Sequence, residues 1–386
     1  MYFCQTVERI YFIFLLLSSI SFSQDAKDWR IECKDWGIEY RQKIGFLAAH
    51  RGTMSHLPQD HAIAGELSFH RVMNGNKIWH HAYRFPSVGA TLFGGSVGNN
   101  EILGNYFGAY GFIEFPMVQA KFYELMWKMG SGLGYAKKVF DQELNPYNVA
   151  MSSHINALVS LGVKSNFYFG MNAITLGLDL THFSNGSFKV PNLGINLPYL
   201  SLGYTRYFLH PARKKTNSTA STENINISSL ELISYLPRKK WFYGITFAGS
   251  VKEIFPTGGK KYPVLGLTAF ARYFGHRKTG FEGGFDIISK QAIMGYKPEI
   301  QKTQLDILQL GIFAGYLLPL DQFHFVFGMG AYLKDKYQPE DAVYHRVGMR
   351  YYFKNGINAQ LQLKTHWARA DYVEWGIGYT FNYKSK

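Results

Sequence analysis

The sequence predicts an all-β protein, an antiparallel transmembrane β-barrel of about 14 to 16 strands, with two tandem eight-stranded barrels as the alternative. Three observations predict it: an export signal, a succession of long strands with two different faces, and connections that alternate between short and long. The composition agrees, with 27 Tyr, 31 Phe and 39 Gly among 386 residues, because membrane barrels need aromatic girdles and small residues where their walls crowd. Many soluble all-β enzymes share this composition, so the order of the residues has to decide.

The N-terminus has the pattern of a secretory signal peptide over residues 1–23. Arg9 precedes the apolar run Ile10–Leu17, and Ser21–Ser23 supplies small residues at the usual cleavage spacing. An apolar stretch of about eleven residues is too short to span a bilayer as a helix. After cleavage Cys33 is the single cysteine, which excludes an internal disulfide. The rest of the chain has no run of about 18 apolar residues, so a helical membrane protein is excluded.

Strands follow one another from about residue 42 onward, with no convincing helical period. The segment Tyr168–Ser184 shows their two faces, and Val373–Asn382 alternates in the same way. In the first segment one face carries Ile174, Leu176, Leu178 and Leu180, and the other carries Ala173, Thr175, Gly177, Asp179 and Thr181. A membrane barrel turns the apolar face to lipid and the polar face to its lumen, whereas a soluble sandwich does the reverse.

Strand length and loop length favour the membrane barrel. The strands reach about eleven to seventeen residues, against five or six in an average strand. Short turns such as Lys164–Asn166, Leu320–Asp321 and Asn355–Gly356 alternate with longer polar loops. The chain also ends on the aromatic-rich segment Trp375–Tyr383, which resembles the terminal strand that the barrel-assembly machinery recognises. We therefore expect this protein in a bacterial outer membrane.

The strands fall into two similar regions. We expect about eight strands in residues 42–209 and about eight more in residues 241–384, separated by a polar, basic linker at residues 210–240. Similar strand counts in two halves suggest an internal duplication, with the second region as a degenerate repeat. One wide barrel and two tandem barrels both remain open.

One short segment of the first half resembles a segment of the second, but their histidines lie on different faces of the strand. Leu180–Phe183 resembles Lys364–Trp367, and each contains a histidine after a threonine. His182 shares a face with the apolar residues of its strand, but His366 shares one with polar residues and should face the lumen. A slip of one residue moves a side chain to the other wall of a barrel.

The segment Thr181–Asn196 contains the strongest candidate for chemistry. It joins two strongly alternating strands and lies at the extracellular end if the mature N-terminus begins in the periplasm. His182 and Ser184 are two residues apart and should both face lipid, and by parity Asn196 should also point outward. Polar groups on the lipid side of a barrel are costly without a purpose.

These residue types are those of a serine hydrolase. A serine beside a histidine supplies a nucleophile and its base, and a third polar group such as Asn196 can orient the imidazole. The turn Asn185–Ser187, including Gly186, could offer N–H groups to a developing oxyanion. His-x-Ser also occurs by chance in many proteins, and a histidine at a membrane interface is more often an anchor.

The pattern His-x-Ser-Asn at residues 182–185, followed by Pro-Asn-x-Gly at residues 191–194, resembles the lipid A 3-O-deacylase family (PagL-like, acyloxyacyl hydrolase-related). The match is specific over this segment and extends over roughly residues 42–209. The resemblance implies an eight-stranded outer-membrane barrel with a serine-hydrolase site on its membrane-facing surface, which removes an ester-linked acyl chain from lipid A.

The resemblance also implies roles for individual residues. His182 matches the general base, Ser184 matches the nucleophile, and Asn185, Gly186 and Ser187 match the oxyanion turn. The third member of the family's triad is a glutamate, and the matching position here is Asn196. An asparagine can orient a histidine but cannot supply negative charge.

Acidic residues that could replace the missing glutamate are few in this stretch. Asp179 points into the lumen by parity, and the nearest others, Asp141 and Glu143, lie in the preceding outer loop. The triad is therefore incomplete in the sequence.

The net charge of +14 suits a surface that handles anionic lipid. Lys189 in the site segment is our candidate for substrate binding, and Lys137-Lys138 and Lys260-Lys261 lie on predicted outer loops. Each basic residue near a headgroup layer contributes about 1 kcal/mol. Basic residues also line pores and periplasmic turns, so a specific phosphate site is one reading among several. A signal peptide followed by membrane-type strands argues against nucleic acid as a partner.

A metal site is not expected. The first outer loop holds His50, His56, Asp60 and His61, but without the closed spacing of a zinc site. We expect no metal and no other cofactor.

The sequence thus predicts an outer-membrane ester hydrolase that acts on lipid A, the lipid part of lipopolysaccharide, at a site facing the outer leaflet. Outer-membrane lipid and the barrel-assembly machinery are its other expected partners. A non-catalytic barrel, either a channel or a surface-binding protein, is the alternative, and Asn196 and the large second half favour it. A soluble exported esterase is a third reading and would fractionate away from the outer membrane.

Overall fold

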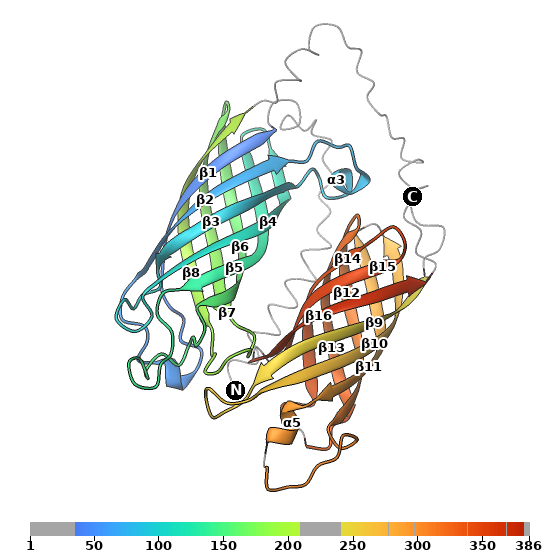
Figure 1. Ribbon diagram of the computed structural model, residues 1–386. Coiled ribbons are helices and arrows are strands. Elements are labelled where there is room, and N and C mark those ends of the chain that lie inside the picture. Colours follow the sequence, from blue (N-terminus) through green and yellow to red (C-terminus); the bar gives the residue numbers. More distant parts are fainter. Residues whose placement is uncertain are drawn as a thin grey trace.

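Two closed antiparallel barrels stand side by side in the computed structural model (Figure 1). The structure describes residues 35–208 and 241–381, except residues 277, 297, 338 and 368. The predicted signal peptide and the linker at residues 210–240 lie outside these described residues. The sixteen described strands divide equally between the two barrels, so the tandem alternative is confirmed and a single wide barrel does not form.

The first barrel contains the first eight strands in sequential order. Each strand pairs with the next, and β1 pairs with β8 to close the wall. The strands are β1 (Trp36–Gly45), β2 (Ala62–Val72), β3 (Ser87–Ser96), β4 (Asn105–Ala120), β5 (Tyr123–Ala136), β6 (Ile155–Phe169), β7 (Asn172–Ser184) and β8 (Ile195–Phe208). Two short helices, η1 (Gly52–Met54) and α3 (Ile78–Ala82), lie in its connections.

The second barrel repeats this architecture, and β9 closes against β16. Its strands are β9 (Trp241–Glu253), β10 (Lys261–His276), β11 (Thr279–Lys290), β12 (Leu308–Leu320), β13 (Phe323–Lys334), β14 (Val343–Tyr352), β15 (Ile357–His366) and β16 (Arg369–Phe381). One short helix, α5 (Ala292–Gly295), follows β11. Within the described ranges, no helix has the length and apolar character needed to cross a bilayer.

The strand faces follow the alternation in the sequence, with the apolar face outward. In β7, Leu178 and Leu180 are exposed, whereas Asp179 and Thr181 are buried in the interior. The buried Asp179 forms ion pairs there with Arg41 and Lys43. Apolar walls around a charged, packed lumen are the arrangement of a small membrane barrel and the reverse of a soluble one.

The connections define two rims in each barrel. We call the end that carries the β7–β8 loop the loop rim, and the opposite end the turn rim. In the first barrel the loop-rim connections are residues 46–61, 97–104, 137–154 and 185–194. Those of the second barrel are residues 254–260, 291–307, 335–342 and 367–368. The turn rims have mostly tight turns, apart from the α3 connection.

The two barrels touch each other at both rims and point in the same direction. At the turn rim, Tyr83 beside α3 donates a hydrogen bond to the Pro319 carbonyl (2.8 Å), and Lys77 pairs with Asp321 (2.8 Å). Apolar residues of the first barrel, including Phe115, pack there against the β12–β13 hairpin. At the loop rim, the β7–β8 loop contacts the second barrel directly.

Candidate active site

His182 and Ser184 end β7 at the loop rim and face outward. Both are half-buried, and they continue the row of exposed leucines on the outer wall. Phe183 between them points inward and packs against the rings of Phe93 and Tyr106 (centroids 5.6 and 5.0 Å away). The alternation of a β-strand therefore places the two polar residues on the membrane-facing side, while an aromatic core anchors the strand from within.

Asn196 of β8 orients the imidazole. The β7–β8 register places Asn196 opposite His182, and the His182 Nδ1 lies 2.7 Å from the Asn196 Oδ1. An amide oxygen only accepts hydrogen bonds, so Nδ1 carries the proton and Nε2 keeps a free lone pair. This is the tautomer that a general base needs.

Gly194 leaves room for the imidazole. Its φ is +76°, and a Cβ at this position would lie 2.9 Å from the His182 Cε1. Both the backbone conformation and the close approach therefore require glycine. The Pro-Asn-x-Gly pattern thus ends on a residue that leaves space for the His182 ring.

His50 joins the site from the first outer loop. Asn196 Nδ2 donates to His50 Nδ1 (3.1 Å), which produces a chain from His50 through Asn196 to His182. His56 instead contacts the Tyr147 carbonyl (2.9 Å), and His61 is exposed beside Asp60. The structure therefore separates the three histidines of this loop. Sequence reasoning missed the role of His50 because it depends on the closure of β1 against β8.

The Ser184 hydroxyl is held by the loop that follows it. Its Oγ accepts hydrogen bonds from the Gly186 N–H (3.2 Å) and the Asn192 Nδ2 (2.9 Å). Within residues 35–208 and 241–381, Ser184 forms no hydrogen bond with His182. Both existing contacts use the oxygen as acceptor, so the hydroxyl proton remains available. Hydrogen bonds between nucleophile and base are often loose in an enzyme without substrate.

Asn192 organises the turn at residues 185–187. Its Oδ1 accepts the Asn185 N–H (3.1 Å) while its Nδ2 contacts Ser184. The Asn185 side chain donates to the Ser153 hydroxyl and the Lys189 carbonyl (both 2.9 Å). Sequence reasoning gave Asn192 no role, although it stands in the Pro-Asn-x-Gly pattern.

Of the three residues expected at the oxyanion turn, only Gly186 donates to Ser184. Gly186 and Ser187 both have positive φ angles, +62° and +63°. The Ser187 Oγ donates to the Ala370 carbonyl of the second barrel (2.8 Å), so this side chain is directed away from Ser184.

No carboxylate contacts the imidazole in the described part of the chain. Asp179 lies in the lumen, as its parity predicts. Asp141 accepts hydrogen bonds from the backbone N–H groups of Glu143 and Leu144 (both 2.9 Å), which hold the pKa of Asp141 below its usual value. Neither loop acid hydrogen-bonds to His182, so within the described residues Asn196 is the side chain that holds the His182 Nδ1.

The second barrel supports the site turn from outside. The Glu253 N–H donates to the Ser187 carbonyl (3.1 Å), and Ala370 accepts from the Ser187 hydroxyl. A Cβ at Gly186 would lie 2.4 Å from the Val373 Cγ2. The turn beside Ser184 therefore packs directly on β9 and β16, a contact that the alternation of the strands did not reveal.

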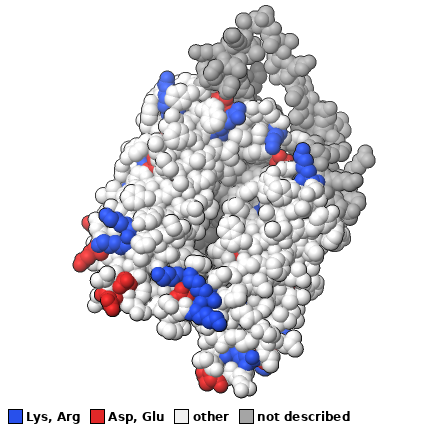
Figure 2. Space-filling model, in the orientation of Figure 1, with Lys and Arg blue, Asp and Glu red and all other residues white. Residues whose placement is uncertain are grey.

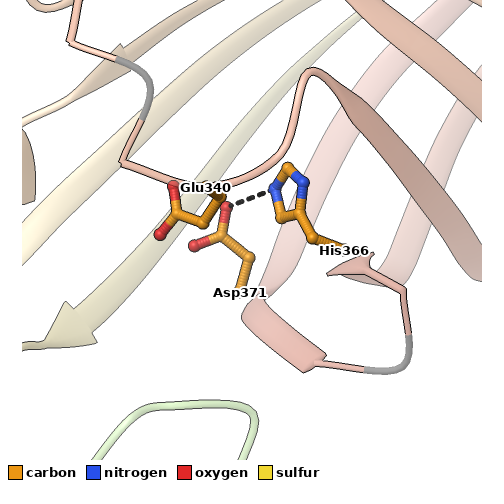
Figure 3. Close-up of side chains that lie close together, drawn as sticks. All are labelled: Glu340, His366 and Asp371. Atoms are coloured by element: carbon orange, nitrogen blue, oxygen red, sulfur yellow. Dashed lines mark hydrogen bonds and ion pairs between the residues drawn. The ribbon is translucent and has the colours of Figure 1, made fainter. Parts of the chain in front are cut away.

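The second barrel buries His366 in a cluster of charged residues. His366 faces the lumen, as its parity predicts, and its Nε2 lies 3.3 Å from Asp371 with Glu340 nearby (Figure 3). The ligand atoms of these three residues lie within 4.8 Å of one another, which is compatible with a metal ion. Lys252 and Lys290, however, each pair with both carboxylates, so the structure shows a neutralised ion-pair network.

Comparisons with known proteins identify both halves. Residues 28–205 match the family model of lipid A 3-O-deacylase (PagL), and residues 241–383 match the model of the C-terminal domain of acyloxyacyl hydrolase. No curated protein matches the chain.

Two solved structures align with this chain at low similarity. Neisserial surface protein A (NspA) aligns at 11% identity with a TM-score of 0.31, over 45% of this chain and 97% of that one. A porin variant of Rh. blastica aligns at 9% identity with a TM-score of 0.17, over 90% of this chain and 99% of that one.

Proposed function

The chain belongs to the PagL-like lipid A 3-O-deacylase family, and on this premise we propose that it is a serine hydrolase of an ester-linked acyl chain of lipid A. The hydrogen bond from His182 to Asn196 on the membrane-facing side of β7 carries the proposal. It supplies an oriented base two residues from Ser184, on the wall that lipid contacts.

The mechanism uses the side chains of the β7–β8 hairpin. Ser184 Oγ attacks the ester carbonyl carbon while His182 Nε2 accepts the hydroxyl proton. As the tetrahedral intermediate collapses, the imidazolium returns that proton to the departing sugar oxygen. Water, activated by the same base, then hydrolyses the acyl-serine, releases the fatty acid and restores Ser184.

Stabilisation of the oxyanion falls to donors beside the nucleophile. The Gly186 N–H and the Asn192 amide lie 3.2 and 2.9 Å from Ser184 Oγ. We assign them to the negative charge that develops on the ester carbonyl oxygen, because this oxygen is bonded to the carbon that Ser184 Oγ attacks and preorganised donors beside it favour the transition state. Asn185 and Ser187 then shape the turn that presents Gly186.

Asn196 and His50 replace the family's carboxylate as the support of the base. Asn196 holds the imidazole in the required tautomer, and His50 accepts from the other end of the same amide. Neither group supplies a negative charge to the imidazolium. We therefore expect a slower reaction than a carboxylate at residue 196 would support.

The location of the site suits an acyl chain in a bilayer. Leu178 and Leu180 are 67% and 41% exposed on the wall just below His182. A fatty acyl chain of a membrane lipid can lie along these side chains without leaving the bilayer. We assign the loop rim to the outer leaflet, where lipid A would present its ester groups to Ser184.

The packed interiors do not favour a channel. The first lumen is filled by buried charged residues such as Arg41, Glu66 and Lys164, and the second by Arg272, Glu282 and Arg350. Eight-stranded barrels are just wide enough for their own side chains. A non-catalytic surface-binding protein is thus the remaining alternative.

Chemical labelling and lipid analysis together test the proposal. A fluorophosphonate should label the wild-type protein in detergent but not Ser184→Ala. A matched control is Ser165→Ala, because Ser165 is another outward-facing serine whose contact with Tyr123 lies far from the site. Mass spectrometry of lipid A should show the loss of one acyl chain with the wild type and Ser165→Ala only. Intact lipid A in cells with folded wild-type protein would contradict the proposal.

A further inference from the structure

The contact between the site loop and the second barrel forms a seam on the loop rim. We define the seam as residues 142 and 185–194 of the first barrel together with residues 253–261 and 370 of the second. Ser187 is held there by Glu253 and Ala370, as described above. A further hydrogen bond runs from the Gln142 Nε2 to the Thr257 Oγ1 (2.8 Å). These contacts bring side chains of the second barrel beside the hydrolytic site.

Three lysines gather at the seam from both barrels. Lys189 belongs to the site loop. Lys260 is the last residue of the β9–β10 connection, and Lys261 is the first residue of β10. The Lys261 Nζ lies 3.3 Å from the ring centroid of Phe188, which precedes Lys189. Figure 2 shows Lys and Arg side chains gathered between the loop ends of the two barrels, with an acidic side chain among them. We call these residues the seam lysines.

The seam lysines have acidic side chains near them but no close ion pair. Lys189 helps to hold the pKa of Asp141 below its usual value, and Lys261 lies opposite Glu253 in the β9–β10 register, where the Glu253 carboxylate accepts the Gly258 N–H (2.8 Å). Across the described ranges, none of the three ammonium groups forms an ion pair, and Lys260 contacts only the ring of Tyr262 (5.6 Å). In contrast, Lys252 and Lys290 just inside the second barrel are neutralised by Glu340 and Asp371. Three ammonium groups without a close ion pair repel one another and attract an anion.

We propose that Lys189, Lys260 and Lys261 form a subsite for a phosphate ester on the headgroup of the lipid substrate. This inference rests on the proposed function. The exposed leucines of β7 lie at the level of acyl chains, whereas the seam lies at the rim, at the level of headgroups. A phosphate at the seam would hold the lipid while one of its acyl esters reaches Ser184.

The subsite assigns a role to the second barrel. The first barrel alone supplies only Lys189, and the second supplies the other two cations in contact with the loop. Ammonium groups bind phosphate as point charges from several directions, so residues from two barrels can share one phosphate. Lys260 and Lys261 thus act in binding and specificity and take no part in proton transfer.

The test is a binding measurement with the full-length protein made inactive by Ser184→Ala. The protein in mixed micelles is titrated calorimetrically with phosphorylated lipid A, with dephosphorylated lipid A and with inorganic phosphate. Each lysine should contribute about fivefold to the affinity, so adding both Lys260→Gln and Lys261→Gln should weaken binding of phosphorylated lipid A by about 25-fold. Binding of the dephosphorylated lipid should not change. The pair Lys260→Arg and Lys261→Arg should retain the affinity.

A matched control removes two charges from another loop of the same rim. Lys334 contacts the Leu305 carbonyl (2.9 Å) and Lys336 pairs with Asp306 (2.6 Å), so their replacement by Gln should leave both affinities unchanged. Equal losses for both lipids, or no loss in the Lys260/Lys261 variant, would overturn the subsite. Inorganic phosphate that binds as tightly as the lipid would overturn the assignment to a headgroup.

The two proposals can fail separately. Phosphate-dependent binding by the Ser184→Ala protein, together with intact lipid A in wild-type cells, would contradict the hydrolase and leave the subsite standing. Hydrolysis by the wild type with phosphate-independent binding would contradict the subsite alone.

Discussion

The seventh strands of the two barrels end in similar sequences and opposite arrangements. In β7, His182 faces lipid, contacts Asn196 and is followed by Ser184 and a long loop. In β15, His366 faces the lumen and contacts Asp371, and in the sequence Ala368 stands where Ser184 follows His182. A histidine next to a carboxylate but sealed inside a barrel cannot reach a lipid. The face of the strand, more than the acidic partner, decides which histidine can act on a membrane substrate.

The bulge in β16 explains how the second arrangement is stabilised. The β15–β16 register shifts between Lys364 and Thr365, which leaves Asp371 as the extra residue of β16. A bulge re-aims a side chain, and here the carboxylate meets His366, Lys252 and Lys290. The first barrel has no such shift in the β7–β8 pairing, so Asn196 remains directly opposite His182.

The largest expected effect separates the two histidines. His182→Ala should lower kcat for lipid A deacylation by about 10³-fold or more, since it removes the general base. His366→Ala should leave kcat within about twofold, because the lumen network is distant from lipid. Rates are measured on purified protein in mixed micelles, with folding checked by heat-modifiable gel migration. Equal losses of kcat in both variants would contradict the conclusion that the face of the strand decides which histidine acts on lipid.

The next effect concerns the space beside the imidazole. Gly194→Ala should lower kcat by about 10²-fold, because its Cβ would displace the His182 ring. Gly170→Ala is the matched control: its φ is also positive (+59°), but nothing lies within 4 Å of the added Cβ. Both variants should lose about 1 kcal/mol of stability from backbone strain, and only the first should lose activity. Full activity in Gly194→Ala would show that the ring is not positioned by this contact.

A smaller effect tests the missing charge. Asn196→Glu should raise kcat/KM by about tenfold, since a carboxylate stabilises the imidazolium that forms during acylation. Asn196→Leu, which can neither orient nor stabilise the ring, should lower it. The two substitutions are compared by steady-state kinetics on the same lipid. A loss in Asn196→Glu as large as that in Asn196→Leu would mean that the site is built for an amide.

The smallest expected effect is a pH dependence of local stability at the turn rim, which is compared with the loop rim. Burial lowers the pKa of His80 in α3 to about 4, and its Nδ1 accepts the Gly75 N–H (3.2 Å). The unfolded segment binds more protons between pH 6.5 and 4, so the contribution of His80 to stability is present above pH 6.5 and is lost as the pH falls toward 4. Hydrogen exchange of residues 73–86 should therefore accelerate on acidification.

His80→Gln should remove most of this pH dependence, whereas His61→Gln in an exposed loop should leave it intact. A glutamine side chain can still accept the Gly75 N–H but does not titrate in this range. Unchanged acid sensitivity in His80→Gln would assign it to another group at the turn rim.

Much of the site could be predicted from the sequence because successive side chains of a β-strand point to opposite faces. That local rule placed His182, Ser184 and Asn196 on the outer wall and Asp179 in the lumen. The family pattern added expected roles for the same residues. Both inferences need only neighbours along the chain, so no tertiary contact was required.

The tertiary structure decided everything that depends on distant partners. The pairing of β1 with β8 created two barrels and brought His50 to Asn196, and the docking of the second barrel placed Ser187 and Phe188 against Glu253 and Lys261. Strand pairing and barrel packing are non-local, and many registers satisfy the same alternation. The sequence by itself thus determined which face each candidate residue occupies, and the closure and contact of the two barrels determined which residues meet there.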